Sequence, residues 1–462
     1  MGKITLSDIK KVHFIGIGGI SMSGLAKILH SKGVSVTGSD ITESALISHL
    51  KSIGIKTYIG HKSENLSNDC QLVVYTAALA DDNPEILEAA ALNILTMDRA
   101  ELLGLIMDEY TRAIGISGTH GKTTTTSLIS EFLLEANYDP TLNVGGILGS
   151  IKSNFRIGKS DYFVAEACEY FDSFSKFYPH IGIILNIDND HTDYFKSEEQ
   201  LRNSFKKFAG NIPTDGFLIA NNAISDLEDF CAQLKCRVIT YGTGGDYCAS
   251  NIVYTTDGKS NFDIHYRGNF VTSISLNLPG IHNVENSLAA FAVGQALGVP
   301  LEAMLRSFAN FSGAKRRFET KGIWNGVQII DDYAHHPTEI NATLSAAKKC
   351  DHKKIYTVFQ PHTFSRTKSF LDSFAESLSA SDVTVLLDIY SAREIDDGSI
   401  HSRDLASKIA ELGAPCHYFE SFEQAKHFLK ANCKKGDMII TMGAGDIFKL
   451  GEDLLGDLSW QK

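Results

Sequence analysis

Short runs of apolar residues alternate along this chain with glycine-containing turns and with stretches that have the apolar spacing of helices. The first apolar run covers residues 12–20 and leads into a helical pattern at 21–29. Further apolar runs follow at 34–38 and 72–75, and a helical pattern follows at 83–92. Apolar runs bounded by turns predict buried strands, and helical spacing predicts helices that pack against them. Roughly the first hundred residues are therefore a predicted α/β domain.

The same alternation continues in two further units. A strand predicted at 112–116 leads through the loop 117–124 into a helix that ends near residue 134. The polar and basic segment 311–319 separates a helical pattern from a new apolar run, so it marks a boundary between units. After it, helical patterns alternate with predicted strands at 355–359, 383–388 and 438–442. This alternation is typical of a parallel sheet, in which ligands bind at the carboxyl ends of the strands.

Composition narrows the class of protein. A chain of 462 residues, 43% hydrophobic and 21% charged, is long enough for about two to four domains. Its 55 acidic and 43 basic residues give a net charge of -12 without any lysine-arginine block, which argues against a nucleic-acid partner. The first ten residues lack the apolar region of a signal peptide, and no apolar run is long enough to cross a bilayer. We therefore expect a cytoplasmic protein without membrane insertion.

Cysteine usage agrees with that expectation. The eight cysteines are scattered and form no CxxC pair. This pattern favours reduced thiols over a disulfide framework or a zinc site, and we assign them no catalytic role.

A glycine-rich turn follows the first predicted strand. Gly16, Gly18 and Gly19 would allow backbone amides to approach a diphosphate at the start of a helix, and Asp40 lies at the distance expected of a ribose-binding acid. A tight turn from strand to helix also needs glycine when no ligand is bound. The pattern therefore indicates a nucleotide site with a structural turn as its alternative.

The loop after the strand at 112–116 predicts an ATP site. Gly118 and Gly121 leave backbone N–H groups free to surround phosphate, Lys122 places a cation on the terminal phosphates, and the Thr123 hydroxyl can bind Mg²⁺. The strict phosphate-loop pattern has a glycine where this chain has Ile116. The arrangement of strand, loop and helix nevertheless favours a phosphate-binding loop.

Acidic residues follow two predicted strands of the central unit. Glu166 ends one apolar run, and the segment 186–193 follows another run at 181–185. Both would lie at the carboxyl edge of the sheet beside the phosphate loop. Because Mg²⁺ prefers oxygen ligands, Glu166 and Thr123 suit one ion, whereas His191 taken alone is more typical of a hydrogen-bonding loop residue.

Ordered segments across nearly the whole chain resemble the Mur ligase superfamily. They are GTHGKTTTT, EACEYFDSF, NIDNDHTDYF, GIHNVENSLAA, GAKRRFE and DDYAHHPTE. Three more, GIGGISMSGLA, FQPHTFSRT and TMGAGD, are similar to the alanine-adding branch of that superfamily. The resemblance implies an α/β fold of three domains: a Rossmann-like domain at 1–106 for the UDP substrate, a central P-loop ATPase domain with a mostly parallel sheet at 107–318, and a Rossmann-like domain at 319–462 that closes on ATP and the amino acid.

The resemblance also implies the activity. The expected enzyme uses ATP and Mg²⁺ to join L-alanine to UDP-N-acetylmuramate through an acyl phosphate, and it serves peptidoglycan precursor synthesis. Its catalytic residues would be Lys122, Glu166 and His191, and its metal ligands would be Thr123, Glu166 and His191. This context makes His191 an expected ligand of a second metal ion.

Two further groups of residues carry over from the matching motifs. The nucleotide group consists of Gly118, Thr119, His120, Gly121, Lys122, Thr123, Thr124, Asn283, Asn286, Arg317 and Asp332. The substrate group consists of Gly16, Gly18, Gly19, Asp40, His335, His336 and Arg366. Asn286 is expected on the adenine, whereas Asn283 has a helix N-cap as its alternative role, and Arg317 has that of a solvated charge between domains. Arg366 would pair with the substrate carboxylate.

Three other functions compete with this one. A murein tripeptide ligase has the same fold and sugar nucleotide but a different amine. A non-catalytic nucleotide sensor would not need Lys122, Thr123, Glu166 and His191 together. An NAD-dependent oxidoreductase would rest on the first glycine turn and Asp40 alone.

Lys206 is expected to be a surface residue. It lies at the offset of a modified lysine found in several Mur ligases, but the alanine-adding branch generally lacks that modification.

Overall fold

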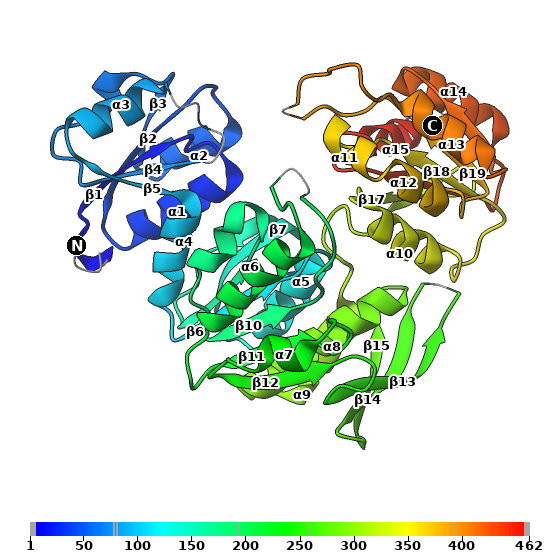
Figure 1. Ribbon diagram of the computed structural model, residues 1–462, viewed down its shortest axis with the longest axis horizontal. Helices are drawn as coiled ribbons and strands as arrows, with labels where there is room; N and C mark the ends of the chain where they lie inside the picture. The colour runs from blue at the N-terminus through cyan, green and yellow to red at the C-terminus, as the bar shows by residue number, and fades with distance from the viewer. Residues whose placement is uncertain are drawn as a thin grey trace.

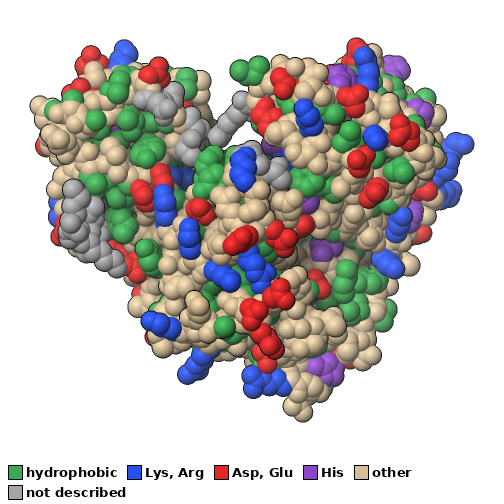
Figure 2. All heavy atoms as spheres, viewed as in Figure 1, with side chains coloured by type: hydrophobic (Ala, Val, Ile, Leu, Met, Phe, Trp, Pro, Cys, Tyr) green, Lys and Arg blue, Asp and Glu red, His purple; other side chains and the backbone are tan. Residues whose placement is uncertain are grey.

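Three sheets, each covered by helices, make up the molecule in a computed structural model (Figure 1). The structure describes residues 6–456 except 77–78, 80–81, 192–193, 257 and 393. The N-terminal and C-terminal domains lie above the central domain in Figure 1, and Figure 2 shows a notch between the two upper domains. On this face acidic and basic side chains are interspersed. Among the described residues, no helix is long and apolar enough to span a bilayer.

The N-terminal domain has a five-stranded parallel sheet in the order β3-β2-β1-β4-β5. Its strands are β1 (Lys11–Ile15), β2 (Ser35–Asp40), β3 (Lys56–Ile59), β4 (Leu72–Tyr75) and β5 (Leu95–Asp98). Its helical segments are η1 (Leu6–Asp8), α1 (Ile20–Ser31), α2 (Ala45–Ser52), η2 (Ser63–Asn65) and α3 (Pro84–Ala91). Because β1 is central, the turn that follows it lies at the carboxyl edge of the sheet, where open α/β sheets bind ligands.

Helix α4 (Arg99–Asp108) connects this domain to the central one. Asp98 and Glu101 form a capping box at its start, which satisfies backbone N–H groups of the first turn. The backbone of η3 (Tyr170–Lys176) passes very close to Gly104, where an added Cβ would lie only 2.0 Å from the Lys176 carbonyl oxygen. Glycine at this position therefore allows the connecting helix to pack directly on the central domain.

The central domain has a ten-stranded sheet in the order β15-β14-β13-β12-β11-β10-β6-β9-β7-β8. Its strands are β6 (Arg112–Ser117), β7 (Thr141–Leu148), β8 (Ser153–Arg156), β9 (Tyr162–Glu166), β10 (Ile181–Ile184), β11 (Phe217–Asn221), β12 (Arg237–Tyr241), β13 (Tyr247–Tyr254), β14 (Ser260–Tyr266) and β15 (Asn269–Leu276). Its α-helices are α5 (Lys122–Glu135), α6 (Glu198–Gly210), α7 (Leu227–Cys231), α8 (Ile281–Leu297) and α9 (Leu301–Asn310). Neighbouring strands pair in parallel through the middle of this sheet, in the order β13-β12-β11-β10-β6-β9-β7. At one end β8 pairs antiparallel with β7, and at the other end β14 and β15 add antiparallel pairs.

The C-terminal domain has a six-stranded sheet in the order β16-β17-β21-β18-β19-β20, parallel except for β16. Its strands are β16 (Glu319–Trp324), β17 (Val327–Asp332), β18 (Ile355–Phe359), β19 (Val383–Leu386), β20 (Cys416–Tyr418) and β21 (Met438–Met442). Its helices are α10 (Pro337–Ala347), α11 (Phe364–Ser369), α12 (Leu371–Leu378), α13 (Ser402–Glu411), α14 (Phe422–Asn432) and α15 (Phe448–Gly456).

Neighbouring residues of the C-terminal strands belong to different apolar clusters. Ile330 and Phe359 pack in one cluster, and Ile329 and Val358 pack in another. Successive side chains of a strand point to opposite faces, so both faces of this sheet are buried under helices. This burial explains the continuous apolar runs from which the strands were predicted.

Candidate active site

The phosphate loop joins β6 to α5 and requires glycine at two positions. Gly118 has φ +133° and Gly121 has φ +86°. A Cβ at Gly121 would lie 2.5 Å from Asn286 Oδ1, so the loop and the start of α8 are in close contact. The loop thus has the conformation from which backbone N–H groups can surround a phosphate.

Lys122 is held at the first position of α5 by a buried carboxylate. Its Nζ lies 3.0 Å from Glu169 Oε2 and donates to the Thr119 carbonyl at 3.1 Å. Burial opposes the lysine charge, but the nearby charge of Glu169 outweighs it and raises the pKa of Lys122. The lysine therefore stays charged, and its ammonium lies beside the loop where phosphates would bind.

Glu166 ends β9 with its carboxylate against the backbone of β7. Glu166 Oε1 accepts a hydrogen bond from Gly145 N at 2.6 Å, and a Cβ on Gly145 would lie 2.4 Å from Glu166 Oε2. Arg317 Nη2 reaches Thr123 Oγ1 at 3.4 Å. Burial raises the pKa of Glu166, while the charges of Arg317 and Lys122 lower it. Carboxylate and hydroxyl oxygens beside a phosphate loop are the donors that Mg²⁺ prefers, so these residues fit the ion.

Gly145→Ala is expected to displace the Glu166 carboxylate and to raise the Mg²⁺ concentration needed for half-maximal activity about tenfold, because shifting a metal ligand weakens binding. The measurement is a Mg²⁺ titration of the initial rate. Gly149→Ala is the matched control, since a Cβ there meets nothing within 4 Å. An unchanged Mg²⁺ requirement in Gly145→Ala would contradict the role of Glu166 as a Mg²⁺ ligand held in place by Gly145.

His191 also faces Glu169, and its backbone has a strained conformation. Its φ is +51°, its ring stacks on Tyr170 with centroids 4.3 Å apart, and its Nε2 lies 3.8 Å from Glu169 Oε1. Burial lowers the pKa of His191, although Asp190 and Glu169 oppose that shift. A neutral imidazole held in one orientation can serve as a metal ligand.

Arg366 reaches into the central domain and pairs with Asp190. The guanidinium Nη2 lies 2.8 Å from Asp190 Oδ1, and both side chains are almost completely buried. Burial opposes ionisation of Asp190, but Arg366 and then His191 lower the pKa of its carboxyl far below the ordinary range. This ion pair joins the C-terminal domain to the residue directly before His191. A small cavity of about 160 Å³ lies beside it, lined by Tyr170, Asp190, His191, His362, Thr363, Ser365, Arg366, Phe370 and Glu394.

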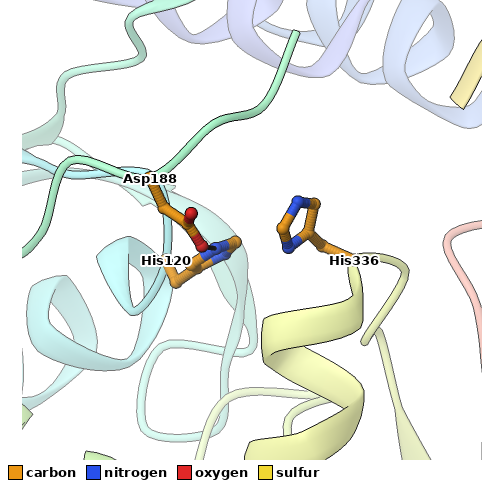
Figure 3. Close-up of side chains that lie close together, drawn as sticks. All are labelled: His120, Asp188 and His336. Atoms are coloured by element: carbon orange, nitrogen blue, oxygen red, sulfur yellow. Dashed lines mark hydrogen bonds and ion pairs between the residues drawn. The ribbon is translucent and has the colours of Figure 1, made fainter. Parts of the chain in front are cut away.

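His120, Asp188 and His336 meet where the central and C-terminal domains face each other (Figure 3). His120 Nε2 lies 2.9 Å from Asp188 Oδ2, and the two imidazole centroids are 4.8 Å apart. Their ligand atoms lie within 4.8 Å of one another, as in a metal site. His336, however, has both ring nitrogens engaged: Nδ1 accepts from Thr338 N at 3.3 Å, and Nε2 lies 3.1 Å from the Asn189 carbonyl oxygen. Hydrogen bonding therefore accounts for this cluster.

A larger cavity of about 380 Å³ opens beside the phosphate loop. Several residues of the predicted nucleotide group line it together, namely His120, Gly121, Thr124, Asn283, Asn286, Arg317 and Asp332. Burial raises the pKa of Asp332 to about 6, and its carboxylate accepts hydrogen bonds from Phe318 N and Ala334 N. Asn283 is not the helix N-cap considered as an alternative: Gly280 caps α8, and Asn283 Nδ2 donates to the Pro279 carbonyl. The cavity lies between two domains and combines apolar walls with polar groups, as ligand sites do.

The first glycine turn uses its amides within the protein. Gly16 N donates to the Ser39 carbonyl at 2.8 Å, Gly18 N donates to Asp40 Oδ2 at 2.9 Å, and Gly19 N donates to the Gly16 carbonyl at 3.1 Å. These bonds match the structural alternative considered for the turn. Asp40 holds Gly18 directly, so in this structure its carboxylate fixes the turn.

Four acidic residues at the site were not assigned a role from the sequence. Glu169 holds Lys122, Asp188 and Glu339 hold His120, and Asp190 holds Arg366. All four belong to the motifs EACEYFDSF, NIDNDHTDYF and DDYAHHPTE, so their place in these motifs was the available signal. Which cation each one meets depends on contacts between distant segments.

Lys206 is part of a helix face and lies beside an open hollow that also includes Asp172, Glu199 and Lys207.

Comparison with known proteins agrees with this arrangement. Family models match residues 11–111 (Mur ligase family, catalytic domain), 116–294 (Mur ligase middle domain) and 316–445 (Mur ligase, glutamate ligase domain). The chain is 52% identical to the UDP-N-acetylmuramate–L-alanine ligase of Clostridium novyi over 96% of this chain and 97% of that one, and 51% identical to that of Lachnospira eligens over 98% and 100%.

Solved structures give the same result. The UDP-N-acetylmuramate-alanine ligase of Thermotoga maritima superposes with a TM-score of 0.80 at 28% identity, covering 98% of this chain and 100% of that one. MurF ligase from the same organism, in complex with ADP, shares the fold at 15% identity with a TM-score of 0.65, covering 93% and 96%. The chain belongs to the Mur ligase family.

Proposed function

We propose that this protein uses ATP to join L-alanine to UDP-N-acetylmuramate in the synthesis of peptidoglycan precursors. The observation that carries the proposal is identity of about half of all residues, over nearly the full length, to enzymes named for this reaction. The structure supports it independently, because a phosphate loop, acidic residues and a nucleotide-sized cavity meet between two domains. In this reaction a carboxylate is first activated, and an amide bond is then formed.

In the first step an oxygen of the sugar nucleotide's lactyl carboxylate attacks the γ-phosphorus, ADP leaves, and an acyl phosphate forms. Lys122 and Arg317 would lie on the phosphate oxygens, where positive charge stabilises the transferred group. Thr123 and Glu166 would hold one Mg²⁺ and His191 a second ion. Such an ion, when bound, neutralises charge on the phosphates.

In the second step the neutral amine of L-alanine attacks the acyl carbon. Inorganic phosphate leaves, and it takes up the proton that the nitrogen loses. We propose that the amino acid occupies the small cavity beside Arg366, with its carboxylate on the guanidinium and Asp190 as the second partner of that group. The cavity, about 160 Å³, has room for a small amino acid. His335 and His336 would position the C-terminal domain against it.

The three domains would divide these tasks. Residues 1–106 would bind the UDP portion at the carboxyl edge of the first sheet, residues 107–318 would bind ATP, and residues 319–462 would close on the nucleotide and the amino acid. The turn at Gly16–Gly19 contributes to the first task by fixing the start of α1 through Asp40.

The proposal predicts phosphate release from ATP that requires both UDP-N-acetylmuramate and L-alanine. The purified protein is assayed with Mg²⁺ and the sugar nucleotide, and L-alanine is compared with a tripeptide that begins with L-alanine and with no amine. Release with L-alanine alone supports the proposal. Release with the tripeptide alone would indicate a murein tripeptide ligase, and no release with either amine would contradict both.

A further inference from the structure

Glu339 lies at the third position of α10, with its carboxylate mostly buried at the contact between the central and C-terminal domains. Its Oε2 accepts a hydrogen bond from His335 N at 3.0 Å. A glutamate at this position often serves to close the first turn of a helix, and an uncharged glutamine serves equally well. The remaining contacts of Glu339 are with charged or titratable groups, which helix capping does not explain.

Three basic side chains from separate segments converge on this carboxylate. His120 Nδ1 of the phosphate loop lies 3.5 Å from Oε1, and Arg317 Nη1 of the segment between domains lies 3.7 Å from it. His335 Nδ1 lies 3.2 Å from Oε2. Burial opposes ionisation of Glu339, but His335 and His120 lower its pKa well below the ordinary range. A buried carboxylate with several basic partners is a strong electrostatic contact.

His120 has a carboxylate on each ring nitrogen. Asp188, on the loop after β10, faces Nε2, and Glu339 faces Nδ1. His336 also faces it from the start of α10, and burial lowers the pKa of that imidazole, so it adds no competing charge. Burial lowers the pKa of His120, but Asp188 and Glu339 outweigh it and raise the pKa to about 9. At neutral pH the ring is therefore an imidazolium that joins the two domains.

We infer that Glu339 is a positioning residue, which holds His120 and Arg317 toward the nucleotide cavity when the C-terminal domain is in contact with the phosphate loop. All three residues line that cavity. The inference rests on the proposed function, since it assigns Glu339 a part in the same reaction. In this inference Glu339 acts through the two cations.

The test uses Glu339→Gln, which retains the backbone contact of the helix cap but removes the charge. We expect kcat to fall about tenfold, the effect of losing one charge-assisted contact. We expect KM for ATP to change less than kcat. The wild-type rate should fall as the pH rises and His120 loses its proton. In Glu339→Gln this fall should begin at a lower pH, because the pKa of His120 would lie closer to the ordinary histidine value of about 6.5. Glu101→Gln is the control, because Glu101 is also at the third position of a helix and accepts a hydrogen bond from a backbone N–H at the start of α4, away from the site.

A second measurement does not depend on activity. In protein with isotope-labelled histidine, the His120 signal is identified by its loss in His120→Gln, and its titration is followed by NMR. Glu339→Gln should lower the pKa of His120. Asp188→Asn should lower it too, and its amide oxygen can still accept the hydrogen bond from Thr338 Oγ1 of α10. An unchanged titration, or a lowered pKa with unchanged kcat, would overturn the inference. If wild-type protein released no phosphate with L-alanine, the proposed function would fail, and the titration would still decide whether Glu339 holds the imidazolium.

Discussion

Lys122→Ala is expected to lower L-alanine-dependent phosphate release by about 10²–10³-fold, the usual effect of removing one preorganised group that stabilises a transition state. The ammonium of Lys122 is fixed by Glu169 and by the Thr119 carbonyl. It therefore needs no reorientation when charge develops on the phosphate oxygens. The measurement is kcat with saturating ATP, UDP-N-acetylmuramate and L-alanine, and Lys408→Ala at the surface is the control.

The single substitution also leaves Glu169 as a buried carboxylate without its lysine. Removing one partner of a buried ion pair typically destabilises a protein by about 3–5 kcal/mol. Lys122→Ala should therefore unfold at a lower temperature than Lys122→Ala with Glu169→Gln, while both stay inactive. If the double variant recovered activity, the loss in the single variant would come from misfolding, and the role of Lys122 in catalysis would be wrong.

Much of the architecture follows from local sequence. Buried strands such as β18 and β21 begin and end at the residues predicted for them, because an apolar run covered on both faces has sharp polar boundaries. The helical pattern at 83–92 became α3, whose Asn83 cap and Pro84 were visible in the sequence. The antiparallel extension from β13 to β15 was not foreseen, since its strands are partly exposed and carry no continuous apolar run.

The residues of the site also differ in how far local sequence predicts them. The phosphate loop and Glu166 can be predicted as site residues from the sequence, because their chemistry depends on residues that are adjacent in sequence or that end a strand. The contacts of His120 with Glu339 and of Arg366 with Asp190 join separate domains, and neither spacing nor composition indicates which cation meets which acid. A single sequence gives the residue types of such a site, but the pairing depends on how the domains pack.

Asp40 shows how one sequence spacing can fit two roles. Its distance from the first glycine turn matched that of a ribose-binding acid, yet its carboxylate accepts a hydrogen bond from Gly18 N. The same spacing serves a ligand or a turn, because both need an acceptor at the carboxyl end of β2 facing the start of α1. A contact between the sugar nucleotide and Asp40 stays a prediction. In the structure the Asp40 carboxylate holds the turn through Gly18 N.

Glu166→Gln is expected to produce the second large loss, and its dependence on Mg²⁺ should distinguish it from Lys122→Ala. The amide still accepts the hydrogen bond from Gly145 N, so the fold around β7 and β9 should be retained. It carries no charge, however, and a carboxylate ligand contributes strongly to Mg²⁺ binding. We expect activity to fall about 10²-fold at ordinary Mg²⁺ and to recover partly at high Mg²⁺, because mass action offsets a weakened site.

Two comparisons make this result specific to the metal. Glu135→Gln changes an exposed glutamate at the end of α5 that pairs with Arg306, and it should leave the Mg²⁺ requirement unchanged. Lys122→Ala should not recover at any Mg²⁺ concentration, because an added ion does not replace a fixed ammonium. If Glu166→Gln kept the wild-type Mg²⁺ requirement, Glu166 would not be a ligand, and the raised pKa that burial gives it would then favour a protonated, structural carboxyl.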